Sequence, residues 1–216
     1  MKRFKRIIVI VTDSVGAGGT PDAERFGDEG ADTLKHIDEA VPGGLKIPNL
    51  RRLGWEKATH IHPEGVKVVG SYGRMREISN GKDTTSGHWE FMGNPVENPF
   101  PVFYDAFPQE LLDTFTEKTG HGWLGNEVAA GTEIIARLGP EHLKTKKPIV
   151  YPSADSVFQI AAHTDVIPLE ELYRICEVTR KEVCVGPYEV GRVIARPFVG
   201  EPGNFVRTGD RQDYSR

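Results

Sequence analysis

Residues 4–19 read FKRIIVIVTDSVGAGG, and this stretch decides the fold class. The run at residues 7–11 is entirely β-branched and apolar, as in a strand that is buried on both faces of a parallel sheet. Basic residues before a short apolar run resemble a signal peptide, but the run ends in Asp13 without a small-residue cleavage site. Because open α/β folds place their sites in the loops after such strands, we expect an α/β fold with functional residues near Asp13.

Composition excludes several classes of protein. The 216 residues carry a formal net charge of −4, so no basic excess indicates nucleic-acid binding. Apolar residues make up 38% and glycines number 24, which is normal for a globular chain with a core. No apolar run approaches the ~18 residues of a membrane span. Cys176 and Cys184 have neither redox-pair nor zinc spacing, so we expect two reduced, buried thiols and a cytoplasmic protein.

Periodicity and capping residues predict alternating helices and strands. We expect helices at residues 33–39, 48–53, 84–91, 108–119, 132–138 and 169–181. We expect strands at residues 149–151, 157–162 and 192–198, and a strand or hairpin at residues 66–75. Three prolines between residues 94 and 101 suggest a linker, so the predicted domains are residues 1–99 and 100–216.

Asp13 is the first candidate for chemistry. A carboxylate at the carboxyl end of a parallel strand is a suitable ligand for a hard cation such as Mg²⁺ or Mn²⁺. The alternative is a turn in which Asp13 accepts hydrogen bonds from the amides of Ser14 and Val15. Residues 16–21 begin like a dinucleotide-binding glycine motif, but Pro21 replaces its last glycine, so we reject that function.

The second candidate is GKDTTSGHWE at residues 81–90. Free N–H groups at the start of the predicted helix can hold a phosphate, and an activated hydroxyl there can accept a phosphoryl group. Thr84, Thr85 and Ser86 are the possible acceptors. Plain helix capping by threonine is the alternative.

Polar residues of the second half form a third candidate group. Arginine forks match phosphate oxygens, and Asp155 could hold sugar hydroxyls. Ordinary salt bridges between the arginines and nearby acids are the alternative. The arginines concerned are Arg192, Arg196, Arg207 and Arg211.

Four segments together resemble the phosphopentomutase family of the alkaline phosphatase superfamily. They are residues 10–37 (IVTDSVGAGGTPDAERFGDEGADTLKHI), 81–93 (GKDTTSGHWEFMG), 151–163 (YPSADSVFQIAAH) and 191–208 (GRVIARPFVGEPGNFVRT). The resemblance extends from Lys5 to Tyr214. It implies the N-terminal part of a metal-binding core, residues 1–99, followed by an inserted mixed α/β cap, residues 100–216.

The resemblance also implies an activity and residue roles. Family members interconvert (deoxy)ribose 1-phosphate and 5-phosphate through a phosphothreonine and a sugar bisphosphate, with two Mn²⁺ ions at the site. Asp13 matches a metal ligand. Thr84 matches the phosphorylated nucleophile, which also faces the metals. The implied substrate-binding residues are Ser153, Asp155, Val157, Arg192, Ile194 and Arg207.

One departure from the family pattern shapes the expected function. The Asp-His-Gly and other metal-ligand motifs of the family's C-terminal core half do not occur in these 216 residues. We therefore expect an incomplete metal-ligand set and no turnover by this chain alone. The competing hypotheses are a related metal-dependent phosphomutase or phosphatase, and a non-catalytic module that binds sugar phosphates.

Overall fold

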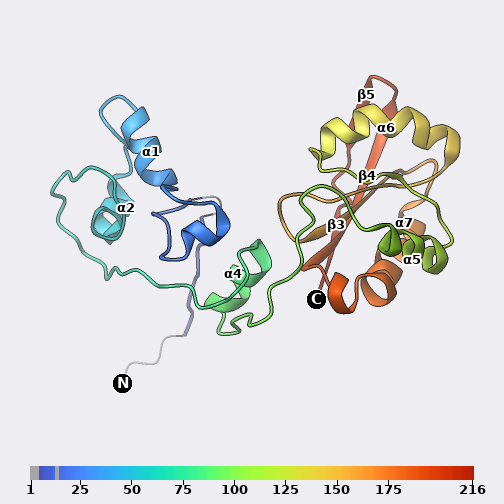
Figure 1. Cartoon of the computed structure of the whole chain (residues 1–216). Coiled ribbons are helices and arrows are strands. Elements are labelled where there is room, and N and C mark those ends of the chain that lie inside the picture. Colours follow the sequence, from blue (N-terminus) through green and yellow to red (C-terminus); the bar gives the residue numbers. More distant parts are fainter. Residues whose placement is uncertain (1–4, 13–14) are drawn as a thin grey trace. The chain divides into compact units, whose positions relative to one another are not determined.

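A computed structural model describes residues 5–12 and 15–216 of the chain. The chain forms two compact units, Met1–Glu77 and Ile78–Arg216, which are described separately below (Figure 1). Its mixture of helices with one mixed sheet confirms the α/β class. The boundary between the two compact units lies after Glu77. The domain boundary expected after residue 99 stays a prediction. No helix in the described part of the chain is long and apolar enough to cross a bilayer.

Short helices make up the regular structure of the first unit. The Asp32 side chain accepts a hydrogen bond from Lys35 N and so caps the predicted helix at residues 33–39. Gly54 ends the helix that begins at Pro48, because its φ of 108° suits a residue without a side chain. Both helices were expected. The elements are η1 (Ala23–Phe26), α1 (Thr33–Ala40), α2 (Pro48–Leu53) and α3 (Trp55–Ala58).

A buried arginine holds the helices of this unit together. Arg51 is fully buried and donates to Glu56 Oε2 at 3.2 Å and to the His62 carbonyl at 2.7 Å. Asp38 lies 3.7 Å from the same guanidinium. A buried charge needs such partners, because burying it unpaired lowers the stability of the fold by roughly several kcal/mol. The first unit therefore depends on a polar network more than on a large apolar core.

Two predicted strands are wrong in this unit. Residues 7–11 pair with no strand of the described chain, and their side chains are between 50% and 83% exposed. A strand of a parallel sheet is buried only when neighbouring strands flank it, and none of the described strands does so. Residues 66–75 form no strand either, and Val69, Tyr72 and Met75 are exposed.

The second unit is built on a six-stranded mixed sheet. Its strand order is β1-β2-β3-β4-β5. Strand β5 pairs with residues 198–201 of β4, and β6 pairs with residues 192–195 of β4. The central pair β3–β4 is parallel, and β4 is antiparallel to both β5 and β6. The strands are β1 (Leu124–Gly125), β2 (Ile149–Tyr151), β3 (Val157–His163), β4 (Arg192–Glu201), β5 (Asn204–Arg207) and β6 (Gln212–Ser215).

Helices cover both faces of this sheet (Figure 1). One face buries the main core, in which Leu111, Leu112 and Phe115 pack near Phe158 as their spacing predicted. The other face packs part of its length against α6, around Ile149, Ala161 and Phe198. The helices are α4 (Thr84–Phe91), α5 (Gln109–Thr119), α6 (Gly131–Thr145) and α7 (Leu169–Val178), with the turns η2 (Thr179–Val183) and η3 (Gly186–Tyr188).

Helix α6 passes through the residues at which the sequence predicted its end. Pro140 has no N–H to donate to the Ala136 carbonyl, which normally ends or kinks a helix. The helix continues because buried residues lie on both sides of the proline: Ile134 and Ile135 before it and His142 after it. His142 Nε2 accepts a hydrogen bond from His163 N at 2.9 Å. Tertiary packing therefore outweighs the local signal.

The two cysteines have the expected state. Both are free and fully buried, Cys176 on α7 and Cys184 just after η2. Burial raises the pKa of Cys184 to about 12 and raises the pKa of Cys176 as well. The neutral thiol is therefore the stable form of both, and they act as small apolar core residues.

Candidate functional site

The sheet face that packs in part against α6 carries the expected substrate residues. Val157 pairs with Arg192 and Gln159 pairs with Ile194, so these four residues are neighbours on one face. Residues 192, 194 and 196 of β4 alternate toward this same face. Val157 and Ile194 are buried, whereas Arg192 is partly exposed. The sheet thus brings three of the predicted site residues together.

Helix α4 begins at the predicted residue, but Asp83 caps it rather than a threonine. The Asp83 carboxylate accepts hydrogen bonds from Thr85 N at 2.9 Å and Ser86 N at 3.0 Å. The Ser86 hydroxyl also donates to it, at 2.5 Å. These amides are therefore not free to hold a phosphate, and the expected cap by a threonine is wrong, because Asp83 caps the helix.

The Thr84 side chain does not cap the helix and instead contacts Asp155. Its Oγ1 donates to Asp155 Oδ2 at 3.1 Å, and its amide lies 3.4 Å from Asp155 Oδ1. Arg192 Nη2 donates to the same Oδ2 at 2.7 Å. Thr84 and Arg192, which come from separate motifs, therefore both contact the Asp155 carboxylate. They lie 71 and 37 positions from Asp155 in the sequence.

A cavity of about 310 Å³ opens beside Thr84. It is lined by Thr84, Thr85, His88, Trp89, Arg192, Asp213 and Ser215. Sequence reasoning missed His88, Trp89 and Asp213. Asp213 is the most informative of them, because it accepts from Arg192 Nη1 at 3.2 Å and from Arg211 Nε at 2.6 Å. The spacing of Arg211 and Asp213 at the start of β6 was the available signal, because alternate residues of an extended chain lie on one face.

The remaining predicted residues occupy two places. Ser153 Oγ lies 3.4 Å from the amide of Asp155, at the start of the loop that carries this carboxylate. Arg207 pairs with Phe198 and so belongs to the same sheet face as Arg196. The salt-bridge alternative is correct for Arg192 and Arg211, which pair with aspartates. Within residues 5–12 and 15–216, neither Arg196 nor Arg207 forms an ion pair with a carboxylate.

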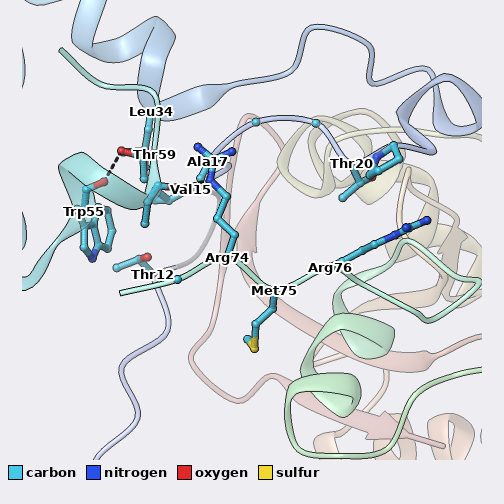
Figure 2. A pocket seen from close by; sticks show the side chains of 15 residues that line it. Thr12, Val15, Ala17, Thr20, Leu34, Trp55, Thr59, Arg74, Met75 and Arg76 are labelled. Atoms are coloured by element: carbon cyan, nitrogen blue, oxygen red, sulfur yellow. Dashed lines mark hydrogen bonds between the residues drawn. The ribbon is translucent and has the colours of Figure 1, made fainter. Parts of the chain in front are cut away.

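Asp13, the expected metal ligand, lies outside the described residues, as does Ser14. The residues on either side of them, Thr12 and Val15, line a cavity of about 490 Å³ in the first unit. Figure 2 shows Arg74 and Arg76 around this cavity together with Trp55, whose carbonyl accepts from the Thr59 hydroxyl at 2.8 Å. The cavity therefore combines apolar walls with two arginines.

The donor set at Thr84 does not by itself hold a metal ion. Hydroxyl and carboxylate oxygens such as those of Thr84 and Asp155 are ligands that Mn²⁺ and Mg²⁺ take. In the described ranges, however, no three His, Cys, Asp or Glu side chains gather in a way that could bind a metal. Asp155 is moreover engaged by Arg192.

Comparisons with known proteins agree with the motifs. A phosphopentomutase of Caldanaerobacter subterraneus subsp. tengcongensis is 54% identical over 214 residues, 98% of this chain and 54% of the relative. A phosphopentomutase of Carboxydothermus hydrogenoformans is 54% identical over 217 residues, 98% of this chain and 55% of that protein. No family model matches the chain. The chain is thus similar in sequence to two phosphopentomutases over almost its whole length, and it spans about half the length of the curated relatives it matches.

Proposed function

We propose that this chain supplies the phosphoryl acceptor and the sugar-binding face of a phosphopentomutase. The observation that carries the proposal is the meeting of Thr84, Asp155 and Arg192 on one carboxylate. A hydroxyl beside a guanidinium suits an acceptor whose product carries about two negative charges. The 54% identity to two phosphopentomutases supports the same activity. The substrates are ribose or deoxyribose 1-phosphate and 5-phosphate.

The transfer uses Thr84 Oγ1 in both directions. A hydroxyl oxygen of the sugar phosphate bonds to the phosphorus of phospho-Thr84 while the Thr84 O–P bond breaks, which gives a sugar bisphosphate. Thr84 Oγ1 then bonds to the other phosphorus, and the sugar keeps the oxygen of the broken P–O bond. The proton that leaves the attacking hydroxyl ends on the leaving oxygen, and Asp155 Oδ2, at 3.1 Å, is placed to hold the Thr84 proton.

The implied metal ions belong to this proposal. Two Mn²⁺ ions would stabilise the negative charge that builds up on the transferred group. Asp13 and Thr84 are the ligands that this chain would contribute, and further ligands would have to come from elsewhere. A sugar bisphosphate acts as activator, because it phosphorylates Thr84. We also propose a cytoplasmic location, since both thiols are free.

The sheet face that carries Arg192 orients the sugar. Val157 and Ile194 are its buried apolar residues, and Ser153 and Asp155 provide oxygen acceptors beside them. Arg192 and Arg207 provide guanidinium groups for phosphate oxygens. Arg192 is already fixed by Asp155 and Asp213, so little side-chain entropy is lost when a phosphate binds.

A second function, binding of sugar phosphates without turnover, is favoured by one observation. The sheet face and its arginines are complete within the second unit, Ile78–Arg216. This unit can therefore bind ribose 5-phosphate weakly through Arg192 and Arg207 even where catalysis is absent.

The test measures conversion of ribose 1-phosphate to ribose 5-phosphate in the presence of Mn²⁺. The proteins are this chain alone and a fusion that adds the remaining half of the Caldanaerobacter phosphopentomutase. We expect turnover by the fusion, none by its Thr84→Val variant, and none by the chain alone. Unchanged turnover by the Thr84→Val fusion would refute the role of Thr84, and an inactive fusion that still binds ribose 5-phosphate would favour the binding function.

A further inference from the structure

Each of the three residues that meet at the Asp155 carboxylate has a direct neighbour in the chain that is buried. Consecutive Cα atoms lie about 3.8 Å apart across a peptide bond, so a residue that is fixed in place also constrains its neighbour. Of these neighbours, Ser156 is 2% exposed and Thr85 is 8% exposed, and Gly191 is buried as well. The pairs of neighbours are Thr84–Thr85, Asp155–Ser156 and Gly191–Arg192.

Ser156 is hydrogen-bonded at its hydroxyl, its amide and its carbonyl. The hydroxyl donates to the Pro101 carbonyl at 2.5 Å and accepts from Gly191 N at 3.1 Å. The amide donates to Asp155 Oδ1 at 3.0 Å, and the carbonyl accepts from Arg192 N at 3.2 Å. Two of these bonds thus reach residues of the site itself, and the hydroxyl ties their segments to the chain at Pro101.

Gly191 leaves room for the start of α4. A Cβ atom at this position would lie 3.2 Å from Thr85 Oγ1 and 3.3 Å from the Ser156 carbonyl oxygen, closer than ordinary van der Waals contact. The φ of Gly191 lies outside the left-handed region, so space rather than backbone conformation favours a glycine here. Thr85, Ser156 and Gly191 therefore form one buried junction. An added methyl group would push α4 away from the loop that carries Asp155.

The contacts of Thr84 and Arg192 with Asp155 are weak by themselves. Thr84 is exposed, and the side chains of Asp155 and Arg192 are 27% and 21% accessible to water. Contacts of this kind contribute little to stability, because water competes for them and flexible side chains must be held in one arrangement. The position of the Thr84 hydroxyl against the carboxylate is therefore set by the buried junction next to it.

We propose that Ser156 is a positioning residue, whose hydrogen bonds hold Asp155 and Arg192 in place for Thr84. Gly191 assists by letting α4 approach. Ser156 is not among the residues that line the cavity beside Thr84, so it acts through its neighbours and not on a ligand. Such placement matters for a group transfer, because a displacement of about 1 Å can lower a rate roughly a hundredfold. The reaction that is served rests on the proposed function, whereas the alignment of the three side chains does not.

The first experiment measures the coupling between Thr84 and Asp155 in this chain by urea unfolding. Thr84→Val, Asp155→Asn and the double variant form a cycle that isolates the contribution of their contact. In the parent chain we expect the contact to change the unfolding equilibrium constant by a factor of roughly two to ten. In a Ser156→Ala background the factor should fall to about one, because the carboxylate is no longer held toward Thr84.

Thr119→Val is the matched control for Ser156→Ala. The Thr119 hydroxyl also donates to a backbone carbonyl, that of Phe115 at 2.7 Å, and accepts from a backbone amide, that of His121 at 3.2 Å. It is likewise buried, so its loss should also destabilise the chain, but the coupling between Thr84 and Asp155 should persist. Coupling that persists in both variants would refute the role of Ser156. Coupling that is lost in both would refute it too, since lower stability alone would then be the cause.

Gly191→Ala tests the same junction with the Ser156 hydroxyl in place, and it decides the question if Ser156→Ala does not fold. We expect the coupling between Thr84 and Asp155 to be lost in this variant. It should return when Thr85→Ala is added, because that change removes the closer of the two contacts of the new methyl group. Full coupling in Gly191→Ala, or no recovery with Thr85→Ala, would show that the junction does not position Thr84.

A second experiment separates this inference from the proposed function. In the fusion with the remaining half of the Caldanaerobacter phosphopentomutase, Ser156→Ala should lower kcat by about ten- to a hundredfold, whereas Thr119→Val should leave it near the parent value. An inactive parent fusion, together with coupling that Ser156→Ala abolishes, would leave the positioning role standing while the mutase function fails. An active fusion whose Ser156→Ala variant turns over as fast as the parent would refute the positioning role and leave the function standing.

Discussion

The Thr84 hydroxyl donates a hydrogen bond to the Asp155 carboxylate at 3.1 Å. The Oδ2 atom of Asp155 accepts this hydrogen bond and another from Arg192 at 2.7 Å, so the carboxylate lies between a hydroxyl and a guanidinium. A phosphoryl group on Thr84 would bring about two negative charges next to Asp155. If Thr84 is the phosphoryl acceptor, as proposed, its phosphorylation should break this contact and move Arg192 from the carboxylate toward the phosphate.

A charged substitution tests this coupling. Thr84→Glu places a carboxylate beside Asp155, and we expect it to lower the free energy of unfolding by about 1–4 kcal/mol, the range between aqueous and protein-like dielectric. Thr84→Gln is the neutral control of the same size and should lose less. In an Asp155→Asn background the difference between Glu and Gln at position 84 should vanish, and an undiminished difference in urea unfolding would contradict the coupling.

The geometry of Arg192 predicts that lysine cannot replace it. Its fork reaches Asp155 with one nitrogen and Asp213 with another. A lysine has one ammonium group and cannot keep both contacts while it binds a phosphate oxygen. We expect Arg192→Lys to weaken ribose 5-phosphate binding about tenfold in calorimetry, which is about 1.4 kcal/mol. Arg137→Lys serves as control, and equal affinity of the two variants would show that the fork is not used.

Two glycines on helices should respond in opposite ways to the same substitution. A Cβ at Gly139 on α6 would lie 2.3 Å from the ring of Phe205, which packs against Phe198. Gly139→Ala should therefore destabilise the chain by about 1–3 kcal/mol. Gly87 on α4 has no atom within 4 Å of that position, so Gly87→Ala should stabilise by up to about 1 kcal/mol. Thermal unfolding of both variants checks the packing of α6, and stabilisation by both would show that it is wrong.

An acidic side chain on α7 gives a pH dependence. Hydrogen bonds from Arg174 and then from His121 lower the pKa of Glu171 to about 2. Since this folded value lies below the unfolded one, near 4.3, the contribution is present above that pH and is lost as pH falls toward 2. The stability difference between the parent chain and Glu171→Gln should therefore shrink from pH 6 to pH 3 in urea unfolding.

Glu177→Gln is the matched control for that series. Glu177 lies on the same helix and pairs with Lys181 at 3.5 Å, but both side chains are more than half exposed. Exposed pairs of this kind contribute about 0–1 kcal/mol. A pH dependence as large for Glu177→Gln as for Glu171→Gln would rule out the Arg174 and His121 contacts as the cause.

Local signals were sufficient for much of the second unit. The start of α4 at Thr84 and the strand at residues 149–151 were predicted to the residue. Capping and periodicity act within a few residues of the chain, so sequence reasoning can use them directly. The sequence indicated Asp155 and Arg192 as candidate binding residues, but not that they are in contact. Their contact depends on the parallel pairing of β3 and β4, which no local signal indicates.

The errors occurred where distant residues decide the outcome. Residues 7–11 have the composition of a buried strand, but burial depends on flanking strands that the described chain does not provide. Pro140 is a strong local stop signal, and the buried neighbours of α6 outweigh it. The Tyr151 hydroxyl and the start of α6 lie twenty residues apart, and no pattern in the sequence indicates that they converge.

The position of the phosphate on the protein shows directly whether Thr84 is the phosphoryl acceptor. The fusion described above is incubated with Mn²⁺ and a pentose 1,5-bisphosphate, and its peptides are mapped by mass spectrometry. We predict one phosphate on Thr84, none in Thr84→Val, and unchanged labelling in Thr85→Val. Phosphate on Thr85, on Ser86 or on no residue of α4 would rule out Thr84 as the acceptor.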